Sequence, residues 1–338
     1  MAKIIGIDLG TANTVITLGK KGVVLSEPSA IAYHTHTKEV LAVGKRAYQM
    51  IGKTPDYIEV IRPLSGGVIS DDRMTQYMIR EFILQVTGHR LTKPRIIICV
   101  PSFITDVEKR AVVEAAMSAG SRKAYLIDEP IAALIGAGVN IGKARGNMVV
   151  DIGGGSTDIA VISMGGRVKA ASVPVAGNAF DRCIAQYVQE KFQISIGPLT
   201  AEALKKQVAC CTKSEFEGVM EVRGHSWETN LPARHVIYTR DLYEPVQELA
   251  SRIAAAARAV LESTPPELAA DVSSSGVLLT GGGSLLRGLA SYIAGELHVD
   301  VAIAPDPLNC VARGTAISLS EGCYLTAGFR DATPKAWH

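Results

Sequence analysis

The chain carries almost no excess charge of either sign. Among its 338 residues, 35 are Lys or Arg and 33 are Asp or Glu, so the formal net charge is +2. Proteins that bind nucleic acid or an anionic membrane mainly by charge need a basic excess, which this composition does not provide. We therefore expect no nucleic-acid partner.

Paired cysteines and long apolar runs are also missing. No Cys-x-x-Cys spacing occurs, so neither a disulfide framework nor a zinc site is indicated. The chain contains no apolar run of about 18 residues, the length that would predict a membrane-spanning helix. Its N-terminus lacks the features of a signal peptide. These absences favour a cytoplasmic protein, which would reach a membrane only through an amphipathic segment or an exposed apolar loop. The cysteines are Cys99, Cys183, Cys210, Cys211, Cys310 and Cys323.

The periodicity of apolar residues predicts the same order of elements twice. At 47% hydrophobic residues, the chain is rich enough in apolar side chains for about two domains, each with a core. The first half is expected to contain strands within 3–18 and 23–33, a helix at 74–87, a strand at 95–100, a helix at 107–119, a strand at 124–127 and a helix from 130. The second half is expected to contain strands at 147–152, 158–163 and 167–174, helices at 179–192 and 243–262, a strand at 276–280, a helix at 284–297, a strand at 299–303 and a helix at 309–320.

This repeated plan indicates two duplicated α/β lobes that face each other across a cleft. Lobe I is expected to span 1–145, with an inserted subdomain at about 33–70, and lobe II to span 146–338, with an insertion at about 181–242. We expect the last helix to pack back on lobe I.

Two glycine-containing turns follow an aspartate at equivalent places in the two halves. These are "DLGTAN", which begins at Asp8, and "DIGGGST", which begins at Asp151. Each lies between two predicted strands, so neither fits a P-loop or a dinucleotide fingerprint, which join a strand to a helix. Backbone N–H groups of such a turn can converge on a phosphate, and a nearby carboxylate suits Mg²⁺ held mostly through water. Ordinary turn chemistry is the alternative, and the second copy argues against it.

Other polar residues acquire meaning only in combination. The glycines at 281–283 follow a predicted strand and could admit a polar group beside the next helix. Glu202 and Lys205 lie three apart on a predicted helix, where a solvated ion pair is the default. In "LIDEPIAALIGAG", Asp128 is a plausible helix N-cap, which leaves Glu129 as a carboxylate at the edge of the cleft, able to orient or deprotonate a water molecule.

The whole series of motifs resembles the MreB family of bacterial actin homologues. The matching segments, in order, are "GIDLGTANT", "EPSAIA", "LAVG", "IRPLSGGVISD", "ICVPSFIT", "LIDEPIAALIGAG", "NMVVDIGGGSTD", "TPPELAAD" and "LTGGGSLLRGL". The resemblance implies an actin-like (RNase H-like) fold that holds ATP, or alternatively GTP, with Mg²⁺ between the lobes. It also implies slow ATP hydrolysis coupled to polymerisation, and filaments at the inner face of the cell membrane that guide the cell-wall elongation machinery of rod-shaped cells.

The resemblance assigns roles by position. Glu129 corresponds to the residue that positions the attacking water, and Ser156 stands where most members carry Thr. Asp8 and Asp151 would organise Mg²⁺. The nucleotide contacts would be Thr11, Ala12 and Asn13 and Gly153, Gly154 and Gly155 for phosphate, Glu202 and Lys205 for ribose and base, and Gly282, Gly283, Ser284 and Leu285 for adenosine.

Some features depart from the family or leave alternatives open. The loop that bears two bulky apolar residues in many members is "TGHRLTKP" here, with Leu91 followed by Thr92. A sugar kinase of the same superfamily stays open because Asp151 or Glu129 could act as its catalytic acid. A chaperone-like ATPase is disfavoured because no peptide-binding domain follows the second lobe. His34 and His36 could share one face of a strand, but no third metal ligand is evident.

Overall fold

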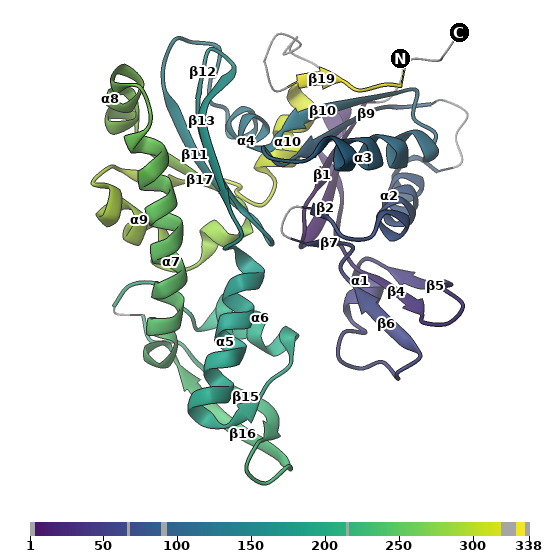
Figure 1. Ribbon diagram of the computed structural model, residues 1–338, viewed down its shortest axis with the longest axis vertical. Coiled ribbons are helices and arrows are strands. Elements are labelled where there is room, and N and C mark those ends of the chain that lie inside the picture. The colour runs from purple at the N-terminus through teal and green to yellow at the C-terminus, as the bar shows by residue number, and fades with distance from the viewer. Residues whose placement is uncertain (1–3, 66–67, 89–92, 214–215, 319–328, 335–338) are drawn as a thin grey trace.

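The computed structural model describes residues 4–65, 68–88, 93–213, 216–318 and 329–334. Two α/β lobes stand side by side, and a smaller subdomain extends from each in the same direction (Figure 1). We call the elements around the first large sheet lobe I and those around the second lobe II. None of the described helices combines the length and the apolar character that crossing a membrane requires.

The two large sheets repeat one topology. The sheet of lobe I has the order β19 (Phe329–Asp331), β10 (Lys123–Asp128), β9 (Arg95–Val100), β1 (Ile4–Leu9), β2 (Asn13–Leu18) and β3 (Val23–Pro28). The sheet of lobe II has the order β18 (Val301–Ile303), β17 (Val277–Thr280), β11 (Asn147–Ile152), β12 (Thr157–Ser163) and β13 (Gly166–Val173). In each, the first strand pairs in parallel with a later strand and antiparallel with the next one. The predicted duplication is thereby confirmed.

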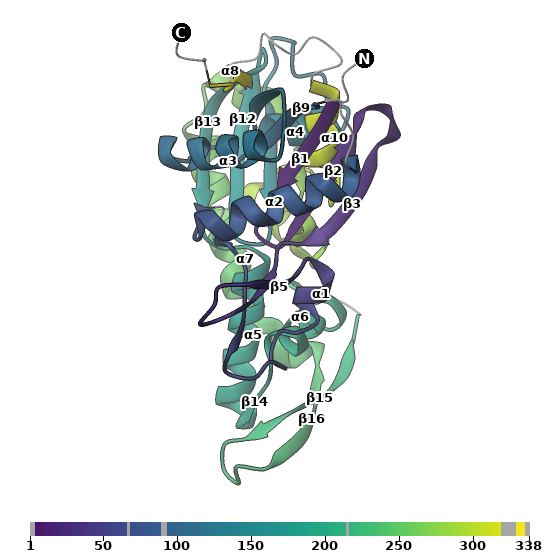
Figure 2. The ribbon, with the colours of Figure 1, turned by 90° about the vertical axis from the view of Figure 1, so that its right-hand side faces the viewer.

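Helices cover the sheets, and small sheets form the extensions. The helices of the first half are α1 (Lys45–Tyr48), α2 (Asp72–Thr87), α3 (Asp106–Ser118) and α4 (Glu129–Gly136). The helices of the second half are α5 (Gly177–Phe192), α6 (Pro198–Gln207), α7 (Thr239–Glu262), α8 (Pro266–Ser275), α9 (Leu289–Leu297) and α10 (Cys310–Ser318). Each half also has a 3-10 turn, η1 (Gly19–Lys21) and η2 (Gly282–Leu285). The small sheets are β5 (Val40–Val43), β4 (Ile31–His34) and β6 (Ile58–Ile61); β14 (Ile194–Ser195), β15 (Val219–Ser226) and β16 (Pro232–Tyr238); and the pair β7 (Leu64–Ser65) and β8 (Val68–Ile69). Figure 2 shows α2 and α3 across the outer face of the first sheet.

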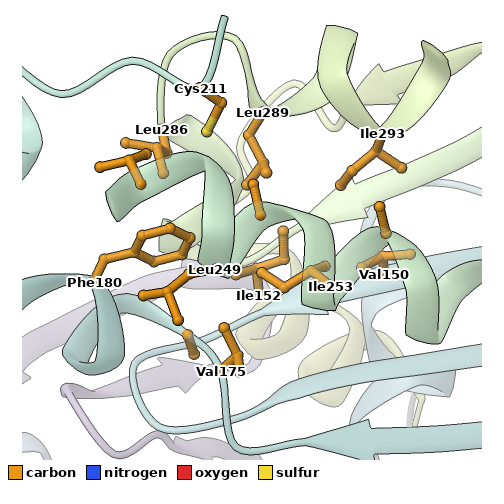
Figure 3. Close-up of a cluster of buried hydrophobic side chains, with 14 of the residues drawn as sticks. Val150, Ile152, Val175, Phe180, Cys211, Leu249, Ile253, Leu286, Leu289 and Ile293 are labelled. Atoms are coloured by element: carbon orange, nitrogen blue, oxygen red, sulfur yellow. The ribbon is translucent and has the colours of Figure 1, made fainter. Parts of the chain in front are cut away.

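The core of lobe II forms where α7 lies on its sheet. Apolar residues of α7 recur every three or four positions, which places them on one helical face. Leu249 and Ile253 of this face pack with Val150 of β11 and with Leu289 and Ile293 of α9 (Figure 3). Each such buried side chain stabilises the fold by about 1.5–3 kcal/mol. The strand that carries Asp151 is therefore held firmly from one side.

The helices α4 and α10 cross at the centre of the molecule with their backbones in close approach. A Cβ atom on Gly136 would overlap the carbonyl oxygen of Cys310, and a Cβ atom on Gly314 would overlap that of Ala132. The C-terminal helix α10 also packs on β1 and β2, where the Thr17 hydroxyl donates to the carbonyl oxygen of Ala312 at 3.4 Å. The two lobes are therefore joined by a tightly packed helix pair.

The predicted helix at 284–297 is wrong in one respect, because the structure divides it. A 3-10 turn covers Gly282–Leu285, and the α-helix begins only at Leu289. Between them Gly288 has a φ of 74°, in the left-handed region. A Cβ atom there would also overlap the Thr212 side chain. The sequence pattern does not reveal this contact because residue 212 lies far away along the chain.

Candidate functional site

A cavity of about 530 Å³ lies between the two lobes and collects the predicted site residues. Its volume is in the usual range for small-molecule sites, which is about 300–1,000 Å³. Among the residues that line it are Asp8, Thr11, Ala12, Asn13, Glu129, Asp151, Gly153, Gly154, Gly155, Ser156, Glu202, Lys205, Gly282, Gly283 and Leu285. Ser284 does not line the cavity, because its side chain is buried and donates to the carbonyl oxygen of Gly281 at 2.7 Å.

The two glycine turns meet at this cavity. One joins β1 to β2 and the other joins β11 to β12, each at the end of an antiparallel pair. A Cβ atom on Gly154 would lie 2.5 Å from the Cβ of Ala12, so the turns of opposite lobes touch. The second turn is closed by the Gly153 N–H, which donates to the carbonyl oxygen of Ser156 at 3.0 Å. The structure thus brings together two segments that the sequence separates widely.

Asp8 and Asp151 face the cavity from equivalent strands. Burial, and next the negative charge of Asp151, raise the pKa of Asp8 to about 7. Burial raises the pKa of Asp151 to about 6, although a hydrogen bond from the Thr280 hydroxyl at 2.7 Å opposes this shift. Two carboxylates withdrawn from water are the oxygen donors that suit a divalent cation.

Glu129 is the first residue of α4 and reaches the cavity. Burial, followed by the charges of Asp158 and Asp151, raises its pKa well above the ordinary value. Asp128 occupies the predicted N-cap position, but its side chain makes no hydrogen bond to the helix. Its carboxylate instead lies 3.6 Å from the guanidinium of Arg167. Glu129 is therefore the acid of this pair that points to the cavity.

A buried acid that sequence reasoning missed lies behind Ser156. The hydroxyl of Ser156 donates to Oδ2 of Asp158 at 3.1 Å, and Asp158 is 1% exposed. A lone acid inside the apolar strand "TDIAVIS" is the signal that could have identified it.

Glu202 and Lys205 both line the cavity, but they do not pair with each other. Glu202 accepts from the ammonium of Lys206 at 2.6 Å and also from the hydroxyl of Tyr48. The ammonium of Lys205 lies 2.8 Å from the carboxylate of Asp181 and donates to a backbone carbonyl. The expected ion pair between positions three apart is therefore wrong, because each side chain finds a better partner.

Residues beside the cavity also connect the two lobes through their extended parts. Tyr48, on α1 of lobe I, reaches Glu202 on α6 of lobe II. Arg62 donates to Oδ1 of Asn178 at 2.7 Å and lies 5.8 Å from the ring centre of Tyr48. We call these four residues the clasp. No sequence signal could have revealed it, because both hydrogen bonds join residues more than one hundred positions apart.

The candidate histidines His34 and His36 do not contribute to the site. Nδ1 of His34 accepts from the backbone N–H groups of His36 and Thr37 at 3.3 and 3.4 Å, so this histidine stabilises a turn. Across the described residues, no cluster of three potential metal-binding side chains occurs. Leu91 and Thr92, the predicted membrane loop, lie outside the described residues.

Comparisons with known proteins agree with this geometry. A family model described as "MreB/Mbl protein" matches residues 2–325. "Cell shape-determining protein Mbl" of Bacillus subtilis is 46% identical and covers 94% of this chain and 96% of its own length. "Cell shape-determining protein MreB" of Escherichia coli K12 is 43% identical, with 92% and 91% covered.

Solved structures add the fold. MreB5 of Spiroplasma citri bound to AMPPNP superimposes with a TM-score of 0.91 at 35% identity, over 95% of this chain and 96% of that one. A MamK double helical filament superimposes with a TM-score of 0.79 at 21% identity, over 95% and 99%, which supports the fold alone. The predicted actin-like fold is confirmed.

Proposed function

Because the chain belongs to the MreB/Mbl family, we propose that it is an actin-like ATPase whose filaments direct cell shape. The observation that carries the proposal is the convergence of both glycine turns, both aspartates and the turn at 282–285 on one cavity. Relatives named for cell shape, and a similar structure bound to AMPPNP, support it.

In this proposal the cavity holds ATP, or alternatively GTP, with Mg²⁺. Asp8 and Asp151 would hold the cation mainly through water, and their donor chemistry fits it because both are carboxyl groups facing the cavity, one partly buried and the other buried. When bound, the cation neutralises charge on the phosphate oxygens. The proposed nucleotide contacts are Thr11, Ala12 and Asn13 and Gly153, Gly154 and Gly155 for phosphate, Glu202 and Lys205 for ribose and base, and Gly282, Gly283 and Leu285 for adenosine. Ser284 is no longer among them, because its buried side chain bonds to the backbone of the turn.

Glu129 and Ser156 are the residues proposed to act on the attacking water. Both line the cavity, and Glu129 lies at the start of a rigidly packed helix. Burial and neighbouring charges raise the pKa of Glu129, which suits a carboxyl group that orients the attacking water by hydrogen bonding or accepts its proton.

We also propose that the protein assembles with itself in the cytoplasm, at the inner face of the membrane, together with the cell-wall elongation machinery. Sedimentation with and without Mg-ATP, read by electron microscopy, tests the central part. Pelleted filaments that depend on nucleotide are expected. ATP binding without filaments under any condition would contradict the cytoskeletal function.

Membrane contact through Leu91 has its own test. The Leu91→Ser variant should pellet less with anionic liposomes than the unchanged protein. Leu41→Ser is the matched control, because Leu41 is an exposed leucine on β5. Equal pelleting of all three proteins would remove this loop from the proposal.

A further inference from the structure

The Ser156 hydroxyl has its hydrogen committed to a buried acid. Its oxygen lies 3.1 Å from Oδ2 of Asp158 and acts as the donor. Ser156 lines the cavity, whereas Asp158 is 1% exposed. A serine hydroxyl has one hydrogen and two lone pairs. With the hydrogen held by Asp158, its oxygen is left to accept a hydrogen bond from whatever lies in the cavity.

Asp158 is well placed to hold this orientation. Asp158 lies on β12, between β11 and β13, and pairs with Asp151 of β11 on one side and Ser172 of β13 on the other. Both neighbouring strands therefore restrain its backbone, and its burial restricts the side chain to few rotamers. Because Asp158 is already fixed, it can orient the Ser156 hydroxyl with no further loss of conformational entropy when the reaction occurs.

We propose that Asp158 is a positioning residue for hydrolysis, which fixes the Ser156 hydroxyl so that its oxygen accepts a hydrogen bond from the attacking water. The inference rests on the proposed function. One hydrogen of the water then points to Ser156, and the other is available to a carboxyl oxygen of Glu129, on the opposite lobe. A water held by both hydrogens turns its lone pairs away from these two acceptors and toward the remaining space of the cavity.

A double-mutant cycle between positions 156 and 158 tests the inference. Asp158→Ala removes the acceptor and is expected to slow single-turnover phosphate release about 10- to 100-fold, with little change in ATP affinity. In the Ser156→Ala background, where no hydroxyl remains to be oriented, the same change should slow release by less than about twofold. Asp158→Asn keeps an oxygen that can accept the hydrogen bond and should retain more activity than Asp158→Ala.

The other possible results of the cycle would overturn the role of Asp158, and one of them would also refute the role of Ser156. An equal loss from Asp158→Ala in both backgrounds would overturn the inference while leaving the role of Ser156 intact. The inference is also overturned if the Asn variant is as slow as the Ala variant, or if ATP affinity falls as far as the rate. Full activity of Ser156→Ala alone would refute the proposed role of Ser156, and the inference with it. If Asp158→Ala does not fold, Asp158→Ser, whose side chain is too short to reach Ser156, takes its place in the cycle.

Discussion

Asp8 and Asp151 are carboxyl groups at the cavity, the first partly buried and the second buried. Their pKa values of about 7 and about 6 lie above the ordinary value of 3.8. Between about pH 4 and pH 7 the folded protein therefore binds more protons than the unfolded chain, so the free energy of unfolding falls as the pH rises through this window. A bound cation would oppose the upward shift of both pKa values, because it favours the ionised form of each carboxyl group.

Removing one of these acids should flatten this pH dependence. Without divalent cations, the melting temperature of the unchanged protein should fall from pH 5 to pH 8, whereas that of Asp8→Asn should fall less. At pH 8 the variant should melt higher by roughly 2–4 °C for each kcal/mol regained. Thermal denaturation across this range measures the effect, with Asp56→Asn, at an exposed loop position, as the control. Parallel curves for all three proteins would contradict the explanation.

The role of Glu129 can be tested without disturbing its packing. Glu129→Gln preserves the shape of the side chain but removes the carboxylate, so phosphate release in a single turnover should slow roughly 100-fold. ATP affinity should change little. Asp128→Asn is the matched control, because Asp128 pairs with Arg167 instead of lining the cavity. Full release by the Gln variant would exclude Glu129 from the reaction.

Among the elements, α4 and α10 depend most strictly on small residues. Their closest contact pairs Gly136 with Cys310 and Gly314 with Ala132, so each helix supplies two small residues four positions apart. Equivalent helices of the duplicated halves thus present equivalent surfaces to each other. Larger side chains would force the two backbones apart, and the lobes with them.

Gly314→Ala is expected to lower the free energy of unfolding by about 1–3 kcal/mol, because the added methyl group has no space. Gly295→Ala is the control. It adds the same methyl group to the exposed side of α9, where nothing lies within 4 Å, and should stabilise by about 0.5–1 kcal/mol. Urea unfolding compares the two. A neutral effect of Gly314→Ala would show that the helix pair can relax.

The sequence predicted elements and site residues to different extents. The strands that carry Asp8 and Asp151 are uniform apolar runs, so their positions and the turns after them followed from local pattern. The division of the predicted helix 284–297 near Gly288 did not follow from local pattern, since it depends on a contact with residue 212. The partners of Glu202 were also missed, because Tyr48 approaches only when the opposite lobe is in place.

At the scale of the whole molecule, the clasp of Tyr48, Glu202, Arg62 and Asn178 connects the two extended subdomains. Three of the four residues line the cavity, and the fourth, Tyr48, is bonded to one of them. We expect a nucleotide that enters or leaves the cavity to pass these contacts or separate them. The clasp therefore couples exchange to the distance between the subdomains.

Tyr48→Phe removes the hydroxyl that reaches Glu202 and keeps the ring. Loss of a hydrogen bond to a charged group is worth about 1.5–3 kcal/mol, so dissociation of a fluorescent ATP analogue should accelerate roughly tenfold or more. Stopped-flow displacement measures the rate. Tyr57→Phe, an exposed tyrosine of the same subdomain, is the control. Equal dissociation rates would indicate that Tyr48 does not restrain exchange.

The crossing of α4 and α10 has a consequence for motion. Backbones in such close approach leave little room to slide, so relative movement of the lobes is reduced to rotation about the crossing point. Displacement in a rotation grows with distance from its centre, and the small sheets lie far from that centre (Figure 1). Glu129 begins α4 itself. Opening the cavity wide enough for a nucleotide would therefore move the subdomain tips most and Glu129 least.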